Sequence, residues 1–213
     1  MISHHHKCIF VHIPKNAGQS IEHVFLDLLD LSWETRAPLL LRPNDRSELG
    51  PPRLAHLKAN EYIQYKYLTT EMFDNYYKFT FVRNPWDRMV SIYKYLGFNN
   101  KCDFKTFLFS YYKDKIFEER FWFVGPQSDF IYDPKGKLLV DFVGRFEDLQ
   151  NDFNQVCRKI GIPLAQLSHI NKSTDEKNAT VFKCYQDYYD QESIAFIEEI
   201  YKSDIELFSY KFD

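Results

Sequence analysis

FVHIPKNAGQSIEHVF, residues 10–25, runs from an apolar segment through a turn of small residues into a helical pattern. The segment Cys8–His12 is apolar, contains β-branched residues and is followed by Pro14, which predicts a short buried strand. We therefore expect a strand, a tight loop and a helix that begins near Gln19. The apolar residues at helical spacing in that helix are Ile21, Val24, Phe25, Leu28 and Leu29.

The same order recurs in YKFTFVRNPWDRMVSIYKYLGF, residues 77–98. Lys78–Val82 predicts a second strand, because Asn84 and Pro85 end the extended pattern. The residues from Trp86 onward have helical spacing, so a helix is expected there. The later elements that the pattern predicts are a strand at Leu138–Val143, a helix at Glu147–Ile160 and a helix at Gln191–Phe208.

Strands that alternate with helices are typical of the α/β class, with a mainly parallel sheet flanked by helices on both faces. Ligands of such sheets bind beyond the carboxyl ends of the strands. The loops that leave the two clearest strands, Pro14–Ser20 and Arg83–Ser91, both carry a cation early and a serine later. If those strands are neighbours, we expect both loops to face one pocket.

Composition limits the class of protein. With 213 residues, of which 45% are hydrophobic and 18% aromatic, the chain is too apolar for disorder. We interpret the proline-rich stretch 34–53 as a surface segment rather than a linker, and expect one domain over residues 1–213. The net charge of −3 argues against broad nucleic-acid binding. No apolar run approaches 18 residues, so no transmembrane helix is expected.

Cysteine and histidine usage indicates neither a disulfide framework nor a metal site. The four cysteines form no CxxC pair, which is typical of reduced thiols in a cytosolic protein. The start of the chain does not resemble a signal peptide. We interpret His4, His5 and His6 as a frayed terminus or a tag remnant, because three adjacent histidines cannot all face one ion from regular structure.

The first loop has the residues of an anion site. Main-chain N–H groups can converge on an anion at a turn containing Ala17 and Gly18, and the following helix adds its positive end. Ser20 supplies a hydroxyl and Lys15 a mobile charge, which together suit a phosphate or sulfate group. The order differs from a Walker A motif, where the lysine follows the turn. The alternative is a Pro-Lys turn capped by Ser20 without any ligand.

The second loop strengthens the anion interpretation. Arg83 leaves its strand, and a guanidinium can bind two phosphate oxygens at once. Ser91 adds a neutral donor on the helix that follows. The alternative is structural: Trp86 in the core, with Asp87 and Arg88 in salt bridges. That alternative would leave Arg83 unpaired at the end of a buried strand.

HIPKNAGQSIE, residues 12–22, followed along the chain by FTFVRNPWDRMVSIYKY, residues 79–95, closely resembles the PAPS-dependent carbohydrate sulfotransferases. The resemblance is to the branch with the heparan-sulfate 2-O-sulfotransferases, the chondroitin and dermatan enzymes and many bacterial relatives. It continues through GPQSDFIYD, VDFVGRFEDLQNDF, HINKST and the closing residues from Tyr189, and so covers nearly all of the chain.

The resemblance implies a three-layer, P-loop NTPase-like sulfotransferase fold and a cofactor, PAPS (3′-phosphoadenosine 5′-phosphosulfate), which gives PAP as product. It implies that Arg83 and Ser91 hold the 3′-phosphate. It implies that the 5′-phosphosulfate is cradled by Lys15, Asn16, Ala17, Gly18, Gln19 and Ser20. The loop NKSTDEK, residues 171–177, matches a later nucleotide-covering loop and adds Lys172, Ser173 and Thr174, or else is an exposed polar turn.

Two residues are candidates for catalysis. Lys15 would stabilise the charge that develops on the bridging oxygen as the sulfuryl group leaves. His56, in PPRLAHLKANEYI, lies where similar carbohydrate sulfotransferases have a catalytic histidine, and a histidine suits a proton acceptor at neutral pH. A surface histidine that packs locally is the alternative for His56. Glu22 and Glu147 are alternative bases, whereas we expect His12 to orient the loop.

The expected reaction is transfer of a sulfuryl group from PAPS to a hydroxyl or amine of a carbohydrate or related acceptor, without a metal. The rival hypotheses are a P-loop-like nucleotide kinase, which would need Mg²⁺ ligands, and a non-catalytic PAP- or nucleotide-binding relative. Because the first strand begins almost at once, we expect a cytoplasmic, bacterial enzyme or an isolated domain. The sequence does not indicate which acceptor is used, nor the oligomeric state.

Overall fold

A computed structural model describes residues 1–167 and 184–213. The chain divides into two compact units. The first unit comprises Met1–Val82 and the stretch that begins at Asp129, and the second comprises Arg83–Ser128 and the C-terminal stretch. The expectation of one domain over residues 1–213 stays a prediction.

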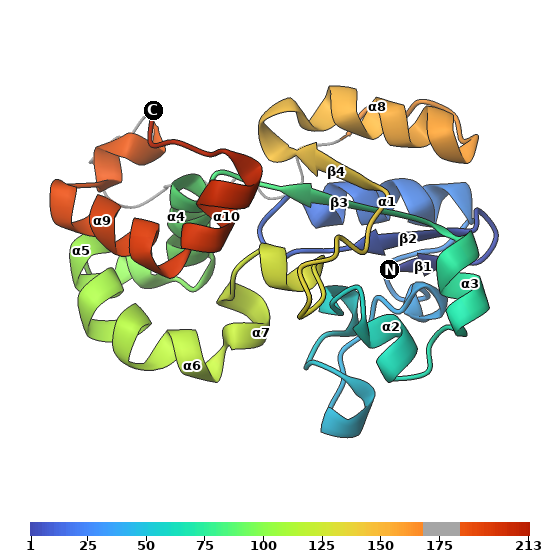
Figure 1. Cartoon of the computed structure of the whole chain (residues 1–213), viewed down its shortest axis with the longest axis horizontal. Helices are drawn as coiled ribbons and strands as arrows, with labels where there is room; N and C mark the ends of the chain where they lie inside the picture. Colours follow the sequence, from blue (N-terminus) through green and yellow to red (C-terminus); the bar gives the residue numbers. More distant parts are fainter. Residues whose placement is uncertain (168–183) are drawn as a thin grey trace. The chain divides into compact units, whose positions relative to one another are not determined.

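A four-stranded sheet forms the centre of the first unit (Figure 1). In spatial order its strands are β1 (Ile2–Ser3), β2 (Cys8–Val11), β3 (Tyr77–Val82) and β4 (Phe142–Arg145). β2, β3 and β4 are parallel, and β1 pairs antiparallel with β2. The prediction of an α/β protein with a mainly parallel sheet is therefore confirmed. Because β2 and β3 are parallel neighbours, their carboxyl ends lie at the same edge of the sheet.

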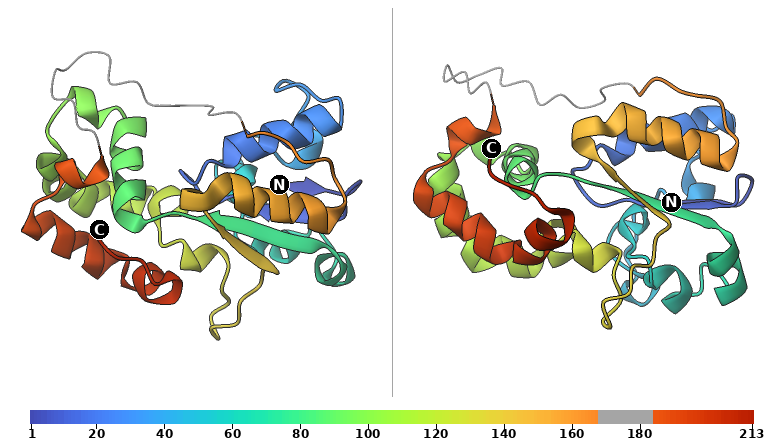
Figure 2. Two further views of the ribbon diagram at one scale, coloured as in Figure 1. Left: turned by 90° about the horizontal axis from the view of Figure 1, so that it is seen from above. Right: turned by 45° about the horizontal axis from the view of Figure 1, so that its top comes forward.

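One face of this sheet is covered by α1 (Gly18–Leu28) and α8 (Leu149–Ile160), which lie side by side (Figure 2). The strands contribute aromatic residues to this face, and the helices contribute aliphatic and aromatic residues at helical spacing. Burying this apolar surface is the main source of stability for the unit. The buried residues of this cluster include Phe10, Phe79, Phe81, Ile21, Phe25, Phe153 and Val156.

The other helices of the first unit are short: α2 (Glu61–Gln64) and α3 (Thr70–Asn75). Tyr62 of α2 is fully buried, and its hydroxyl donates a hydrogen bond to the main-chain oxygen of Phe10 at 3.2 Å. The proline-rich stretch 34–53 is irregular, as expected, with the brief 3₁₀ turns η1 (Ala37–Leu39) and η2 (Ser47–Leu49) and an isolated antiparallel bridge between Pro43 and Arg53.

The described part of the second unit is helical. It begins with α4 (Pro85–Tyr95), whose apolar residues from Met89 to Tyr93 are largely buried, as predicted. Its aromatic-rich middle packs inward through residues that include Phe104, Phe107 and Tyr112. The remaining elements are η4 (Phe98–Asn100), α5 (Phe104–Phe107), the π-helix η5 (Leu108–Ile116), α6 (Phe117–Glu119), α7 (Phe121–Val124), η8 (Tyr185–Tyr188), α9 (Gln191–Ile200) and α10 (Lys202–Phe208).

The third predicted strand was misplaced. Leu138 pairs with Tyr132 in an isolated antiparallel bridge, and the strand of the sheet begins only at Phe142. The strand continues to Arg145 instead, through Gly144. A Cβ atom at residue 144 would lie 2.5 Å from the ring of Phe81, so glycine is what allows the strand to pack there.

Two further expectations need correction. The predicted helix Gln191–Phe208 is two helices, because α9 ends at Ile200 and α10 begins at Lys202. The interpretation of His4–His6 as a frayed terminus or tag remnant is wrong. Ile2 and Ser3 pair with β2, and Nδ1 of His4 lies 2.9 Å from the hydroxyl of Tyr76.

Within residues 1–167 and 184–213, no helix combines the length and the apolar character needed to cross a membrane.

Candidate active site

The loop between β2 and α1 has an unusual backbone. Lys15 and Ala17 both adopt the left-handed conformation, with φ angles of 71° and 59°. Ala17 is also the N-cap of α1, an eleven-residue helix. Left-handed non-glycine residues are uncommon because they are strained, and such strain is typical of functional sites. A turn of this kind before a helix is a geometry in which main-chain N–H groups collect an anion.

Some side chains of this loop are buried and others are half-exposed. Asn16 is buried, and its Nδ2 donates to the main-chain oxygen of Phe81 at 2.7 Å, which ties the loop to β3. Ser20 is also buried, and its main-chain N–H bonds to the oxygen of Ala17 at 3.0 Å. Lys15 and Gln19 are half-exposed. The amide nitrogen of Asn16 thus has a structural role that the sequence did not predict.

A buried contact between a histidine and a glutamate supports the loop. Nδ1 of His12, the residue that follows β2, lies 2.5 Å from Oε1 of Glu22 on α1, and both side chains are almost fully buried. A Cβ atom at residue 18 would lie within 2.5 Å of three ring atoms of His12, so Gly18 packs directly on the imidazole. The expectation that His12 orients the loop fits this contact. The sequence suggested Glu22 only as an alternative base and did not predict its pairing with His12.

Gly18→Ala is expected to lower the free energy of unfolding by about 1–3 kcal/mol, because the new methyl group overpacks the ring of His12. Urea denaturation monitored by circular dichroism measures the change. The control is the same substitution in a His12→Ala background, where the ring is gone and most of the effect should disappear. An equal loss of stability in both backgrounds would contradict the contact.

His56 lies in the 3₁₀ turn η3 (Leu54–His56) and is 7% exposed, so it is not the surface histidine of the alternative interpretation. Its Nδ1 lies 3.0 Å from the main-chain oxygen of His12. A carbonyl can only accept, so Nδ1 carries the hydrogen and Nε2 has the lone pair. Burial, followed by the neighbouring His12, lowers the pKa of His56 well below its ordinary value of 6.5. The ring is therefore neutral at neutral pH.

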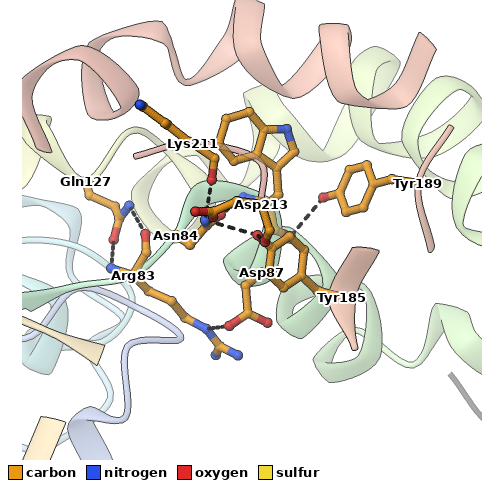
Figure 3. A network of polar contacts seen from close by, with 9 residues as sticks. Arg83, Asn84, Asp87, Gln127, Tyr185, Tyr189, Lys211 and Asp213 are labelled. Carbon is orange, nitrogen blue, oxygen red and sulfur yellow. Dashed lines mark hydrogen bonds and ion pairs between the residues drawn. The ribbon is translucent and has the colours of Figure 1, made fainter. Parts of the chain in front are cut away.

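The second loop follows β3 directly. Asn84 caps α4 by accepting a hydrogen bond from the N–H of Trp86 at 3.1 Å. Nε of Arg83 lies 2.7 Å from Oδ2 of Asp87, one helical turn away, as Figure 3 shows. Ser91 lies one further turn along the same face of α4 and is half-buried. The burial of Trp86 confirms that it belongs to the core.

The structural alternative for this loop is partly right. The salt bridge of Asp87 is present, and its partner is Arg83, which that alternative was expected to leave unpaired. Arg88 is buried and donates to the main-chain oxygens of Gly125 and Phe123 at 3.0 and 3.2 Å. The i,i+4 spacing of Arg83 and Asp87 is the signal that could have revealed their pairing.

Gln127 was missed as a neighbour of Arg83. Its Oε1 accepts from the N–H of Arg83 at 2.9 Å, and its Nε2 donates to the oxygen of Arg83 at 2.8 Å (Figure 3). The two residues are 44 positions apart, and no local pattern in the sequence signals the contact.

The third predicted nucleotide loop, with Lys172, Ser173 and Thr174, lies outside the described residues. Among the residues that are described, no group of three histidine, cysteine or acidic side chains could hold a metal ion.

Each of the two described loops carries groups that can donate hydrogen bonds to an anion. The first offers the ammonium of Lys15, the start of α1 and the hydroxyl of Ser20, without a bulky side chain at Gly18. The second offers a guanidinium whose Nε edge is fixed by Asp87. Each set suits an oxyanion of sulfate or phosphate.

Comparison with known proteins agrees with this chemistry. A relative described as an uncharacterized protein, from Archaeoglobus fulgidus, is 35% identical over 118 residues, which are 50% of this chain and 85% of that protein. No solved structure matches the chain. Residues 1–211 match the profile of the sulfotransferase family. The chain therefore belongs to the sulfotransferase family, and the protein is a PAPS-dependent sulfotransferase.

Proposed function

We propose that the protein transfers a sulfuryl group from PAPS to a hydroxyl or amine of a carbohydrate or related acceptor, and releases PAP. The observation that carries this proposal is the strained Pro14–Ser20 loop, which joins a buried strand to the start of α1 and has Lys15 near its beginning. Family membership supports the use of PAPS. The carbohydrate class of the acceptor rests on the resemblance of the motifs.

The proposed binding residues follow the two described loops. Lys15, the main chain of residues 16–19 and Ser20 bind the 5′-phosphosulfate. Arg83 and Ser91 bind the 3′-phosphate, for which the guanidinium provides charge-assisted hydrogen bonds. Lys172, Ser173 and Thr174 are proposed as additional nucleotide contacts from sequence alone.

Lys15 and His56 have complementary roles in the proposed reaction. The bond between sulfur and the bridging oxygen of PAPS breaks as a bond from sulfur to the acceptor atom forms. Lys15 stabilises the negative charge that grows on the bridging oxygen. Nε2 of His56 accepts the proton that the acceptor hydroxyl loses, which its neutral state allows. We propose that a metal is not required, because the transferred group carries less charge than a phosphoryl group.

The type of α/β fold and the cellular location are part of the same proposal. We propose that the α/β sheet is the centre of a three-layer, P-loop NTPase-like sulfotransferase fold formed by one domain, residues 1–213. The parallel β2 and β3, with an anion loop after β2, support this assignment. All four cysteines are free thiols, which suits a cytoplasmic enzyme.

Calorimetric titration with PAP, and with ADP as control, tests the function without a known acceptor. We expect metal-free PAP to bind much more tightly than ADP, because only PAP has a 3′-phosphate. Equal affinities, or binding that needs Mg²⁺, would favour a nucleotide kinase. If neither nucleotide binds, the catalytic proposal fails and a degenerate site is the remaining explanation.

A further inference from the structure

Arg83 is held by its main chain as well as by its side chain. It is the first residue after β3, where the pairing of the strand ends. There the side-chain amide of Gln127 makes the two hydrogen bonds that a neighbouring strand would otherwise make. It accepts from the N–H of Arg83 at 2.9 Å and donates to the oxygen of Arg83 at 2.8 Å. Figure 3 shows this amide against the main chain of Arg83, with Asp87 at the guanidinium. Both ends of the arginine are therefore fixed.

Gln127 is itself fixed by a buried carboxylate. Its side chain is fully buried, and its main-chain N–H donates to Oδ2 of Asp204 at 2.7 Å. The N–H of Ser128 donates to Oδ1 of the same carboxylate at 2.8 Å. Asp204 is also fully buried, and burial raises its pKa, although the two N–H groups and Arg88 oppose that shift.

The residues before Gln127 are held by a second buried charge. Arg88 is 1% exposed, and it donates to the oxygens of Phe123 and Gly125. Burying a charge is unfavourable unless it is well hydrogen-bonded. Two buried charged residues, Arg88 and Asp204, bond to the main chain of residues 123–128, which indicates that the position of this segment matters. Arg88 and Asp204 thus hold residues 123–128 in place, with the amide of Gln127 against the main chain of Arg83.

We propose that Gln127 is a positioning residue for the 3′-phosphate site, holding Arg83 where its guanidinium binds that phosphate. This inference rests on the proposed function of Arg83. A bidentate contact with a phosphate needs a guanidinium in a defined place, and small displacements of a binding group cost affinity steeply. Gln127 does not itself contact the nucleotide.

The test compares PAP with AMP, which lacks the 3′-phosphate but shares the rest of the nucleotide. Calorimetry gives the preference for PAP over AMP in the full-length wild type and in Gln127→Met, which keeps the size of the side chain but loses both hydrogen bonds. We expect the preference to fall by about tenfold in the variant through weaker PAP binding, while AMP binding stays unchanged. Asn44→Leu is the matched control. It loses amide bonds to the main chain of Arg46 and should keep the wild-type preference.

The outcomes separate the inference from the function on which it rests. If the wild type does not prefer PAP to AMP, the proposed role of Arg83 is wrong. If the wild type prefers PAP and Gln127→Met keeps that preference, the role of Arg83 stands and the role of Gln127 is refuted. Should Gln127→Met fail to fold, Gln127→Asn takes its place, because its shorter amide cannot make both bonds. A preference unchanged in that variant would equally overturn the inference.

Discussion

Lys15→Ala is expected to lower the rate of sulfuryl transfer on the order of 10²–10³-fold, while the affinity for PAP changes much less. The lysine acts on charge that exists only as the bond to sulfur breaks, so its removal affects the transition state more than the bound product. Hydrolysis of labelled PAPS to sulfate, followed with and without an acceptor, measures this loss without requiring the natural acceptor. Titration with PAP measures the affinity.

The chain offers a matched control for this variant. Lys66 is an exposed lysine that also has a left-handed backbone, with a φ of 60°. Lys66→Ala therefore removes the same charge from the same conformation, and it should change neither rate nor affinity. If Lys15→Ala weakens PAP binding as much as it lowers the rate, then Lys15 is a binding residue and does not act on the leaving group.

His56→Ala is expected to lower transfer to an acceptor by about 10²–10⁴-fold, because a positioned general base contributes on that order. PAP binding should stay close to that of the wild type. Single-turnover transfer from labelled PAPS, with an acceptor found by screening carbohydrates, measures the effect. A variant that keeps full activity would move the role of base to another residue.

His56→Asn separates basicity from packing. An asparagine amide can still donate to the main-chain oxygen of His12, as Nδ1 of the imidazole does, but it cannot take up a proton. We expect the same loss of transfer as in His56→Ala. The pH profile adds a second check. A base acts in its neutral form, and the pKa of His56 is well below 6.5, so wild-type kcat/KM should fall only below that pH. An acidic limb centred above pH 6.5 would contradict this role.

The first strand, loop and helix were predictable because their signals are local. An extended pattern that ends before Pro14 predicted the strand Cys8–His12, which matches β2 within one residue. The helical pattern that follows predicted the start of α1 within one residue. The second strand and α4 were equally close, because Asn84 and Pro85 mark the boundary between them. The third strand was predicted too early in the chain. Its apolar residues begin before the point at which Gly144 lets the chain approach Phe81.

The support of the candidate site was not predictable in the same way. The sequence suggested Lys15, His56 and Arg83 by residue type and motif. It gave no reason to join Gln127 to Arg83, or Asp204 to Gln127, since these partners are far apart along the chain. The pairing of His12 with Glu22 depends on how tightly the loop turns, which follows from two left-handed residues that are not glycine.

By itself, the sequence determined the α/β class and the parallel pairing expected of its clearest strands, and it suggested the proposal that two loops bind anions. These follow from periodicity and from the chemistry of single side chains, both of which are local. Only the tertiary structure decided that Nδ1 of His56 donates to His12, that Asp87 holds Arg83 and that Arg88 is an internal anchor. A hydrogen bond or ion pair forms only where folding brings two groups within about 3 Å of each other, and that distance is not encoded at either residue alone.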